Sequence, residues 1–354
     1  MRLTKWIKFI KENINFYRDG FFEIPYLSNS PQVMIKSIIN SPSARHVAGE
    51  QAIYRNNPFS KGVMRYREIE EGFWIIATEI TFKKNVMLKA IYDEDVPSDY
   101  HTLTFSVFES QVKLQNTFQD KIPFSSKYWG FKKPNTEVGA YFYKDSVCNF
   151  YLYCFNDNWI KNNLAFETLS NDNQIKSFLN SKNGFITYQD IVPNAAELSM
   201  QVYKNLERAK FDPESNSKLQ AQTSSLVASF FTNAYNNNRK AVTDPLENTD
   251  YRKVAKAEKL ITDNLATTFL GVEEIANQVN MSPTKLKNSF KAVYGTSMLQ
   301  YHISKKMLLA MQLIQNTDMQ IKNITNEVGY ESPSKFAATF KKQFGKLPSE
   351  VRSF

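Results

Sequence analysis

The sequence predicts an α+β protein, in which an antiparallel β-barrel or sandwich is followed by helices and then by a separate all-α domain. β-Branched and aromatic runs separated by turn-rich segments occupy roughly residues 45–156, and from Trp159 onward the apolar residues recur at helical spacing. A polar, Asn-rich stretch with Pro245 marks a linker at 236–250. We therefore expect a first domain over 1–240, β-rich at 45–156 and helical at 159–237, and a second domain over 251–354.

An amphipathic helix is expected at the start of the chain, before the β-rich part. It either docks onto its own protein or lies on a membrane surface. No apolar run reaches the roughly 18 residues of a membrane span, so neither secretion nor membrane insertion is expected. The apolar stripe of this helix consists of Leu3, Trp6, Ile7, Ile10 and Ile14, opposite Arg2, Lys5, Lys8 and Lys11.

The strands of the β-rich part are predicted at 73–82, 86–92, 103–108, 138–143 and 147–155. Cys148 and Cys154 are six residues apart on the last of these, about 20 Å in an extended strand, which is too far for a disulfide. Two free, buried cysteines fit a cytoplasmic protein. Helices are predicted from Trp159 and at 194–210 and 217–235, and their apolar stripes either pair two subunits or only cover the barrel.

The last hundred residues contain a repeated unit. Residues 282–295 read SPTKLKNSFKAVYG and residues 332–345 read SPSKFAATFKKQFG, with six of fourteen positions identical at an offset of 50. Each copy has a short helix, then a residue that tolerates the left-handed conformation (Asn280 or Gly329), and then Ser-Pro, which is typical of a helix start. The small residues Ala276 and Thr325 allow the two helices to cross closely, so each copy is predicted to be a helix-turn-helix.

The two copies are separated by a long apolar segment, 297–315, which is predicted to be one rigid helix. Such a helix would hold the second helices of both units at a fixed separation, so that both enter the major groove on one face of DNA. The charge supports this interpretation, because residues 251–354 carry 15 Lys and Arg against 8 Asp and Glu, most of the net charge of +9. The sequence therefore predicts double-stranded DNA binding.

This region resembles the AraC/XylS family of transcription regulators over about residues 257–352. The resemblance rests on IANQVNMSPTKLKNSFKAVYGTSMLQY, on IKNITNEVGYESPSKFAATFKKQFGKLPSEVR, and on the spacing of the closing Gly345, Pro348 and Arg352. The sequence departs from the family pattern at Lys306, Thr325 and Ala338. The resemblance implies an activator or repressor of promoters, with RNA polymerase as a partner and a homodimer as the working form.

The resemblance also implies which side chains meet DNA. Base readers lie on the exposed side of each second helix, and the lysines around them meet phosphates, which position the protein without specifying sequence. Lys and Asn discriminate bases better than Pro, Ser and Ala do, so the first unit is expected to contribute more specificity. The base readers carried onto this chain are Thr284, Lys287, Asn288, Pro333, Ser334 and Ala338, and the phosphate contacts are Lys285, Lys291, Lys335, Lys341 and Lys342.

The first domain shows no catalytic or metal-binding pattern. The chain has only His46, His101 and His302, too few for a three-histidine metal centre, and the acidic loop at 93–99 is typical of a solvated turn. Neither a cofactor nor an enzyme activity is expected. The density of Phe, Tyr and Trp instead favours a cavity for a small-molecule effector. The alternatives are that this domain only recruits a partner protein, or that it is an enzyme fused to a DNA-binding domain.

Overall fold

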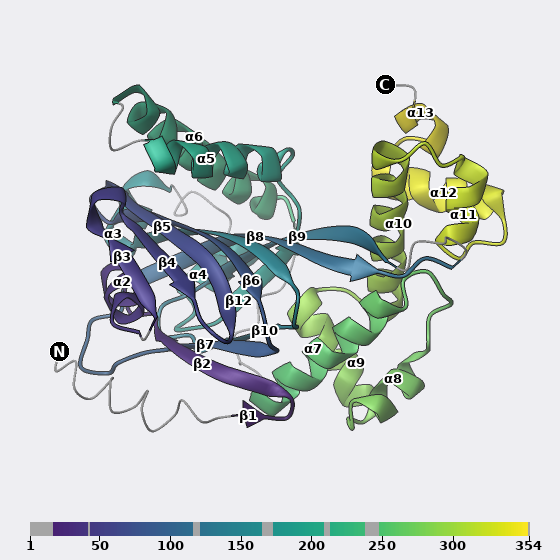
Figure 1. Ribbon diagram of the computed structural model, residues 1–354, viewed down its shortest axis with the longest axis horizontal. Helices are drawn as coiled ribbons and strands as arrows, with labels where there is room; N and C mark the ends of the chain where they lie inside the picture. Colours follow the sequence, from purple (N-terminus) through teal and green to yellow (C-terminus); the bar gives the residue numbers. More distant parts are fainter. Residues whose placement is uncertain are drawn as a thin grey trace. The chain divides into compact units, whose positions relative to one another are not determined.

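The computed structural model describes residues 17–41, 43–115, 121–164, 173–208, 213–237 and 248–352. It divides into two compact units, the first formed by residues 1–108 and 127–248 and the second by residues 109–126 and 249–354. The predicted fold class is confirmed, since the first unit is built on β-sheets with helices and the second is mainly helical (Figure 1). The expected N-terminal helix and linker residues 238–247 lie outside the described part of the chain. No helix within the described ranges combines the length and apolar character that crossing a bilayer requires.

An eight-stranded sheet forms the larger part of the first unit. Its strand order is β12-β9-β8-β11-β6-β5-β4-β3, and the long β6 and β11 run antiparallel with Phe73 opposite Phe155. The bounds of the strands are β3 Ala44–Val47, β4 Ala52–Asn56, β5 Ser60–Glu70, β6 Phe73–Phe82, β8 Tyr100–Val112, β9 Ile122–Lys132, β11 Val147–Asn156 and β12 Phe185–Gln189.

A smaller four-stranded sheet has the order β1-β2-β7-β10. It contains β1 (Tyr17–Arg18), β2 (Phe21–Leu27), β7 (Val86–Ile91) and β10 (Gly139–Phe142). Here β2 and β7 are parallel. This pairing involves a strand that precedes residues 45–156, the range for which antiparallel strands were predicted. The long excursion of the chain between β2 and β7, through α2 and β3 to β6, provides the crossover that parallel neighbours need.

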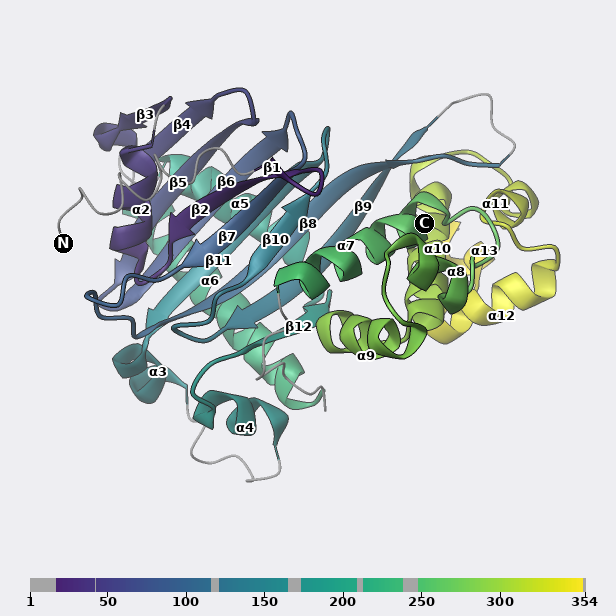
Figure 2. The same cartoon turned by 90° about the horizontal axis from the view of Figure 1, so that it is seen from below.

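The two faces of the eight-stranded sheet are covered by different layers (Figure 2). On one face, Ile75 and Tyr153 belong to a hydrophobic core shared with Val202 and Phe230 of the long helices. On the other, Ile80 and Cys148 pack with residues of the smaller sheet, and helix α2 covers Ile53 and Ile76. The helices of this unit are α2 (Pro31–Ile39), α3 (Asp157–Asn163), α4 (Gln174–Asn180), α5 (Ala195–Arg208) and α6 (Pro213–Tyr235).

The apolar stripes of α5 and α6 therefore cover the sheet. Val202 and Leu206 of α5 and Leu226, Phe230 and Phe231 of α6 are all buried in this one core. The structure thus uses the stripes inside one subunit, which is one of the two roles that the sequence left open. The predicted free state of the cysteines is confirmed, because Cys148 and Cys154 are both buried and unbridged.

The second unit is built from seven helices within the described residues. The predicted linker ends inside the first turn of α7, because that helix already begins at Asn248. Residues 109–126, from the ends of β8 and β9, belong to this unit as well, although the sequence boundary at residue 250 separates them from it. The helices are α7 (Asn248–Asp263), α8 (Val272–Gln278), α9 (Pro283–Tyr294), α10 (Met298–Asn316), α11 (Ile321–Glu327), α12 (Pro333–Phe344) and α13 (Pro348–Arg352).

Candidate nucleic-acid interface

The first repeated unit forms a helix-turn-helix from α8 and α9, as predicted. Asn280 adopts a left-handed conformation in the turn, with φ of 53°. Ser282 caps α9 by accepting a hydrogen bond from the backbone N–H of Lys285, and Pro283 occupies the first helical position. Ala276 is fully buried, which leaves room for the close crossing of the two helices.

The second repeated unit forms the equivalent pair from α11 and α12. Ser332 caps α12 through the backbone N–H of Lys335, and Thr325 lies fully buried at the crossing, with its hydroxyl donating to the Ile321 carbonyl at 2.8 Å. Gly329 in the turn has φ of 68°, and a Cβ added there would lie 2.3 Å from the carbonyl oxygen of Ala266. Glycine is therefore required at this turn for both conformation and space.

The predicted connecting helix is α10, which is capped by Ser297. Its 19 residues give a length of about 28 Å at 1.5 Å per residue. Buried residues occur on every turn, including Tyr301, Leu309 and Leu313, and Gln343 of α12 donates to the Ser304 carbonyl at 3.1 Å. Contacts around its whole circumference make α10 a rigid spacer.

Three basic residues on α10 are buried, and their surroundings disfavour the charged forms. Burial lowers the pKa of Lys305 to about 7, although the carboxylate of Glu258 opposes this shift. Burial also lowers the pKa of Lys306 to about 8, and its Nζ donates to the Thr267 carbonyl at 2.9 Å. Burial, with the nearby positive charge of Lys306, lowers the pKa of His302 to about 4. These groups are part of the domain core and are not available to DNA.

The candidate base readers are exposed. On α9, Thr284, Lys287 and Asn288 lie three and four residues apart on one face, opposite the buried Leu286 and Phe290. Their counterparts on α12 are also solvent-exposed, on the side away from the buried Phe336 and Phe340. These counterparts are Pro333, Ser334 and Ala338.

The candidate phosphate contacts differ from one another in their partners. Lys285 forms an ion pair with the buried carboxylate of Asp250, with 2.8 Å between Nζ and Oδ2. This partner already compensates the positive charge of Lys285. The other candidates are exposed and have no ion pair with a described residue; they are Lys291, Lys335, Lys341 and Lys342.

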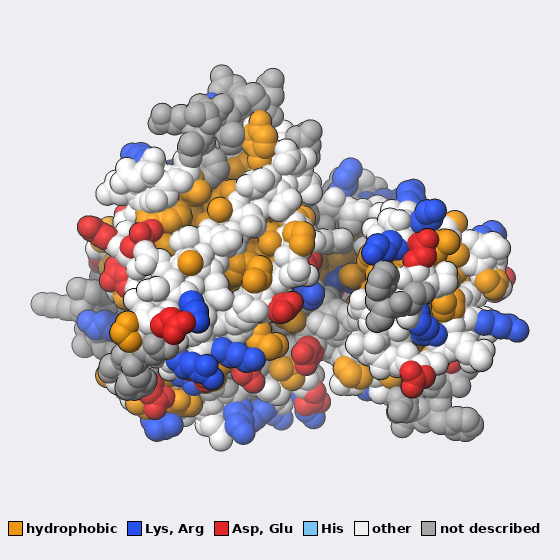
Figure 3. Space-filling view, turned by 90° about the horizontal axis from the view of Figure 1, so that it is seen from above, with side chains coloured by type: hydrophobic (Ala, Val, Ile, Leu, Met, Phe, Trp, Pro, Cys, Tyr) orange, Lys and Arg blue, Asp and Glu red, His pale blue; other side chains and the backbone are white. Residues whose placement is uncertain are grey.

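Some lysines of the second unit stabilise the fold itself, which could not be predicted from the sequence. Lys253 and Lys256 of α7 donate to the carbonyls of Asn280 and Gln278, at 2.7 and 2.9 Å, and so cap the end of α8. Together with the paired Lys285 and the buried Lys305 and Lys306, five lysines act inside the domain. Figure 3 nevertheless shows Lys and Arg side chains spread over the visible face of the second unit.

The described part of the first unit contains no cluster of metal-ligating side chains. Among the described residues, no group of three or more His, Cys, Asp and Glu side chains is placed to hold a metal ion. The two histidines of this unit have separate partners: His46 Nε2 lies 2.7 Å from the Tyr66 hydroxyl, and His101 Nε2 lies 2.9 Å from Asp157.

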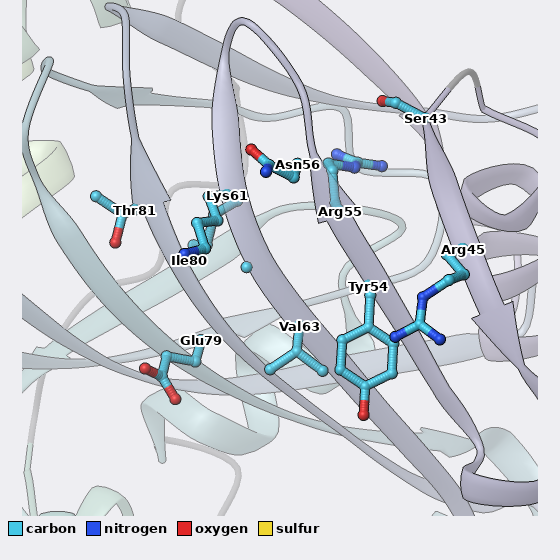
Figure 4. Close-up of a pocket in the computed structure, with 11 residues that line it drawn as sticks. Ser43, Arg45, Tyr54, Arg55, Asn56, Lys61, Val63, Glu79, Ile80 and Thr81 are labelled. Carbon is cyan, nitrogen blue, oxygen red and sulfur yellow. The ribbon is translucent and has the colours of Figure 1, made fainter.

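A hollow of about 570 Å³ opens on the first unit over strands β3 to β6 (Figure 4). Most of the residues that line it are polar or charged, and Tyr54 is the aromatic residue among them, whereas the sequence predicted a cavity with aromatic walls. The guanidinium of Arg45 lies over the ring of Tyr54 at 4.5 Å, and Arg55 and Lys61 add two more cations. Burial lowers the pKa of Arg55. Glu79 on β6 is the acidic residue among those that line the hollow.

Comparison with known proteins places the second unit among helix-turn-helix domains. A family model described as a helix-turn-helix domain matches residues 275–353. The arabinose operon regulatory protein of Escherichia coli is 30% identical over 109 residues, which are 31% of this chain and 36% of that protein. The HTH-type transcriptional regulator AlkR of Acinetobacter baylyi is 35% identical over 81 residues, 23% of this chain and 26% of that protein.

Solved structures of DNA-binding proteins are similar to part of the chain. An AraC-type transcriptional regulator from Chromobacterium violaceum is 29% identical, with 29% of this chain and 91% of that chain covered and a TM-score of 0.28. The DNA-binding domain of AdpA in complex with a target DNA is 25% identical, with 28% of this chain and 90% of that one covered and a TM-score of 0.27.

The matched region spans about a third of the length of the arabinose operon regulatory protein. The family-model match, residues 275–353, runs from α8 to the end of α13 and so includes both reading helices and the helix between them. The chain thus carries, in its second unit, a DNA-binding domain of the AraC/XylS family of transcription regulators.

Proposed function

We propose that this protein is a sequence-specific transcription regulator that reads two adjacent major grooves of promoter DNA. The observation that carries the proposal is the pair of capped helices, α9 and α12, each with one buried and one exposed face, joined by the rigid α10. A helix with free polar side chains on its exposed face fits the major groove of B-DNA. The chemistry of these faces is recognition, not catalysis.

The first helix-turn-helix unit is proposed to supply most of the base discrimination. Lys287 donates hydrogen bonds, which suits guanine O6 and N7, and the Asn288 amide can pair with adenine N6 and N7. On α12, Ser334 offers one hydroxyl, and Pro333 and Ala338 offer only apolar contacts. The second helix-turn-helix unit then positions the protein on DNA and contacts thymine methyl groups, and it contributes less to readout by hydrogen bonds.

Selection of DNA fragments by the purified full-length protein tests this proposal. We expect one enriched sequence with two half-sites about one helical turn, roughly 34 Å, apart. Asn288→Ala should cost about 1–3 kcal/mol on the selected site and relax preference at one or two base pairs. Ser334→Ala is the matched control on α12 and should change preference less.

Lysine variants separate positioning from readout. Lys342→Ala should weaken binding to all sequences alike and flatten the dependence of affinity on salt, because one phosphate contact is lost. Lys285→Ala should flatten it less, because Lys285 is already paired with Asp250. Equal enrichment of random and selected DNA by the wild-type protein would refute sequence-specific regulation.

The first unit is proposed to bind a small-molecule effector, and the hollow over β3 to β6 favours an anionic one. Arg45, Arg55 and Lys61 outnumber the acidic Glu79 on its walls, and guanidinium groups bind carboxylates and phosphates with paired hydrogen bonds. Thermal unfolding of the full chain with dicarboxylates, sugar phosphates and neutral sugars tests this. Stabilisation by an anionic class should disappear in Arg45→Ala and persist in Lys144→Ala, whose exposed side chain lies outside the hollow.

The alternative is that the first unit only recruits a protein partner. It would be favoured if none of these ligands stabilises the protein while the chain still activates transcription with purified RNA polymerase, the partner that we propose for it.

We propose a homodimer as the working form and the cytoplasm as the location, where promoter DNA is found. Exposed Met200 of α5 and Tyr235 of α6 are candidates for the dimer contact, and Figure 3 shows apolar side chains on that side of the first unit.

A further inference from the structure

The ends of strands β8 and β9 leave the sheet of the first unit and join the second. We call residues 109–126, which belong to the second unit, the arm. Its two sides continue β8 and β9, so the arm is covalently part of the eight-stranded sheet at its base. In Figure 2 the ends of β8 and β9 reach the helices of the second unit.

The arm contributes side chains to the core of the second helix-turn-helix unit. Val112, Leu114 and Phe124 are 2%, 3% and 1% exposed. They belong to one hydrophobic cluster with residues of α10, α11 and α12, including Ala310 and Phe336. Burial of three large apolar side chains removes apolar surface from water and stabilises this core. The arm is thus an integral part of this core and not a loop resting on its surface.

Polar contacts fix the register of the arm on α10. The side-chain amide of Gln312 pairs with the backbone of Ser125 in both directions: the Ser125 N–H donates to Oε1 at 3.2 Å, and Nε2 donates to the Ser125 carbonyl at 2.7 Å. Nζ of Lys305 lies 5.9 Å from the centre of the Phe124 ring. These groups hold the arm at the middle of the connecting helix.

A further contact leads from the arm to the turn of the second helix-turn-helix. Gln115 donates from Nε2 to the Ala266 carbonyl at 2.7 Å. The same carbonyl oxygen lies against Gly329, the left-handed residue between α11 and α12. The arm therefore supports both the connecting helix and the residue that sets the angle of the second reading helix.

From these contacts we propose that the arm couples the first unit to DNA binding by holding α10 and the second helix-turn-helix in the reading geometry. When the arm is docked, the core is complete and α12 is ordered. When it is undocked, α10 loses apolar partners, and the second helix-turn-helix loses its alignment with the major groove. The inference rests on the proposed function, because it assigns a regulatory contact to that same DNA-binding surface.

Coupling of this kind is reciprocal, so operator DNA must stabilise the docked arm. Hydrogen exchange of the full-length wild-type protein, with and without the selected operator, measures this directly. We expect slower exchange at residues 109–115 and 121–126 when the operator is bound, although the candidate DNA contacts lie on α9 and α12. Unchanged exchange of the arm in a saturated complex would overturn the proposal.

Substitutions give a second readout. Leu114→Ala should weaken operator binding about tenfold, within the roughly 5–150-fold range of typical couplings. It should also remove the part of the footprint that belongs to the second helix-turn-helix. Gln111→Ala is the matched control, because Gln111 lies in the same segment of the arm but is exposed. Gln312→Ala, which removes two hydrogen bonds without deleting core side chains, should act in the same direction if Leu114→Ala does not fold.

The outcomes distinguish the two proposals. Failure of the wild-type protein to select any DNA sequence would refute the proposed function. Selection by the wild type, with equal affinity and footprint for Leu114→Ala and Gln312→Ala, would refute only the role of the arm. A Lys113→Ala variant that flattens the salt dependence of binding would place the arm on DNA itself, and the indirect action proposed here would be wrong.

Discussion

Replacing Gly329 with alanine should selectively unfold or distort the second helix-turn-helix. The left-handed conformation, with φ of 68°, costs a residue with a Cβ about 1–2 kcal/mol. The added carbon would also lie 2.3 Å from the Ala266 carbonyl oxygen, well inside the roughly 3.3 Å at which carbon and oxygen normally meet. Relieving such overpacking typically costs about 1–3 kcal/mol. Together these effects give a loss of about 2–5 kcal/mol.

The first helix-turn-helix provides the matched control for this prediction. Asn280 occupies the equivalent turn, has φ of 53°, and is exposed. Asn280→Ala keeps a Cβ that is already accommodated, so we expect a loss of about 1 kcal/mol from the left-handed conformation alone. Only the strain of the backbone is shared between the two sites, and the steric clash is specific to Gly329.

Hydrogen exchange of the full-length variants, together with DNA footprinting, measures both effects. Gly329→Ala should raise exchange across residues 321–344 and leave residues 272–294 as in the wild type. The footprint should shrink to the half-site of the first helix-turn-helix. If Gly329→Ala destabilises its unit no more than Asn280→Ala destabilises the other, then the close approach to Ala266 does not constrain the turn and the reasoning fails.

Three further predictions concern α10. Because burial lowers the pKa of Lys305 to about 7, the unfolded chain binds more protons than the folded chain between pH 7 and about 10.5. The free energy of unfolding should therefore rise with pH in this range, and urea unfolding should show that the rise is lost in Lys305→Met. Because the pKa of His302 is lowered to about 4, the free energy of unfolding should fall as pH falls from about 6.5 to 4, and His302→Leu should weaken that dependence. Identical pH profiles of stability for the wild type and His302→Leu would contradict the lowered pKa. Leu308→Pro should break α10 at a cost of about 3 kcal/mol or more and reduce the footprint to one half-site, whereas an unchanged footprint from folded protein would exclude a rigid pair.

The DNA-binding region could be predicted from the sequence because its signals are local. Ser282 and Ser332 precede Pro, Gly295 and Gly345 follow the last turn, and these residues do cap and end the predicted helices. Helix caps depend on neighbours within four residues, so a single sequence carries the information.

Features set by distant partners could not be predicted. Strand β5 was not predicted, because Arg65 and Arg67 interrupt its apolar pattern; they contact Glu207 and Asn216 of the overlying helices, more than 140 residues away. Strand β9 and the late strand β12 were also missed, since polar residues interrupt the first and helices precede the second. The structural role of Lys253 and the ion pair of Lys285 likewise need the fold to become visible.

The arm also affects how the chain is made. Leu114 and Ala310 share one core although nearly 200 residues separate them in sequence. During synthesis the arm emerges long before α10, so its apolar side chains stay exposed to water and to other chains until the C-terminal helices follow. Contacts of such large sequence separation slow folding. A fragment that begins at residue 251, or a chimera with another regulator's first domain, would lack these side chains, so transplantation of the DNA-binding domain requires residues 109–126 or a polar replacement for the surface that they cover.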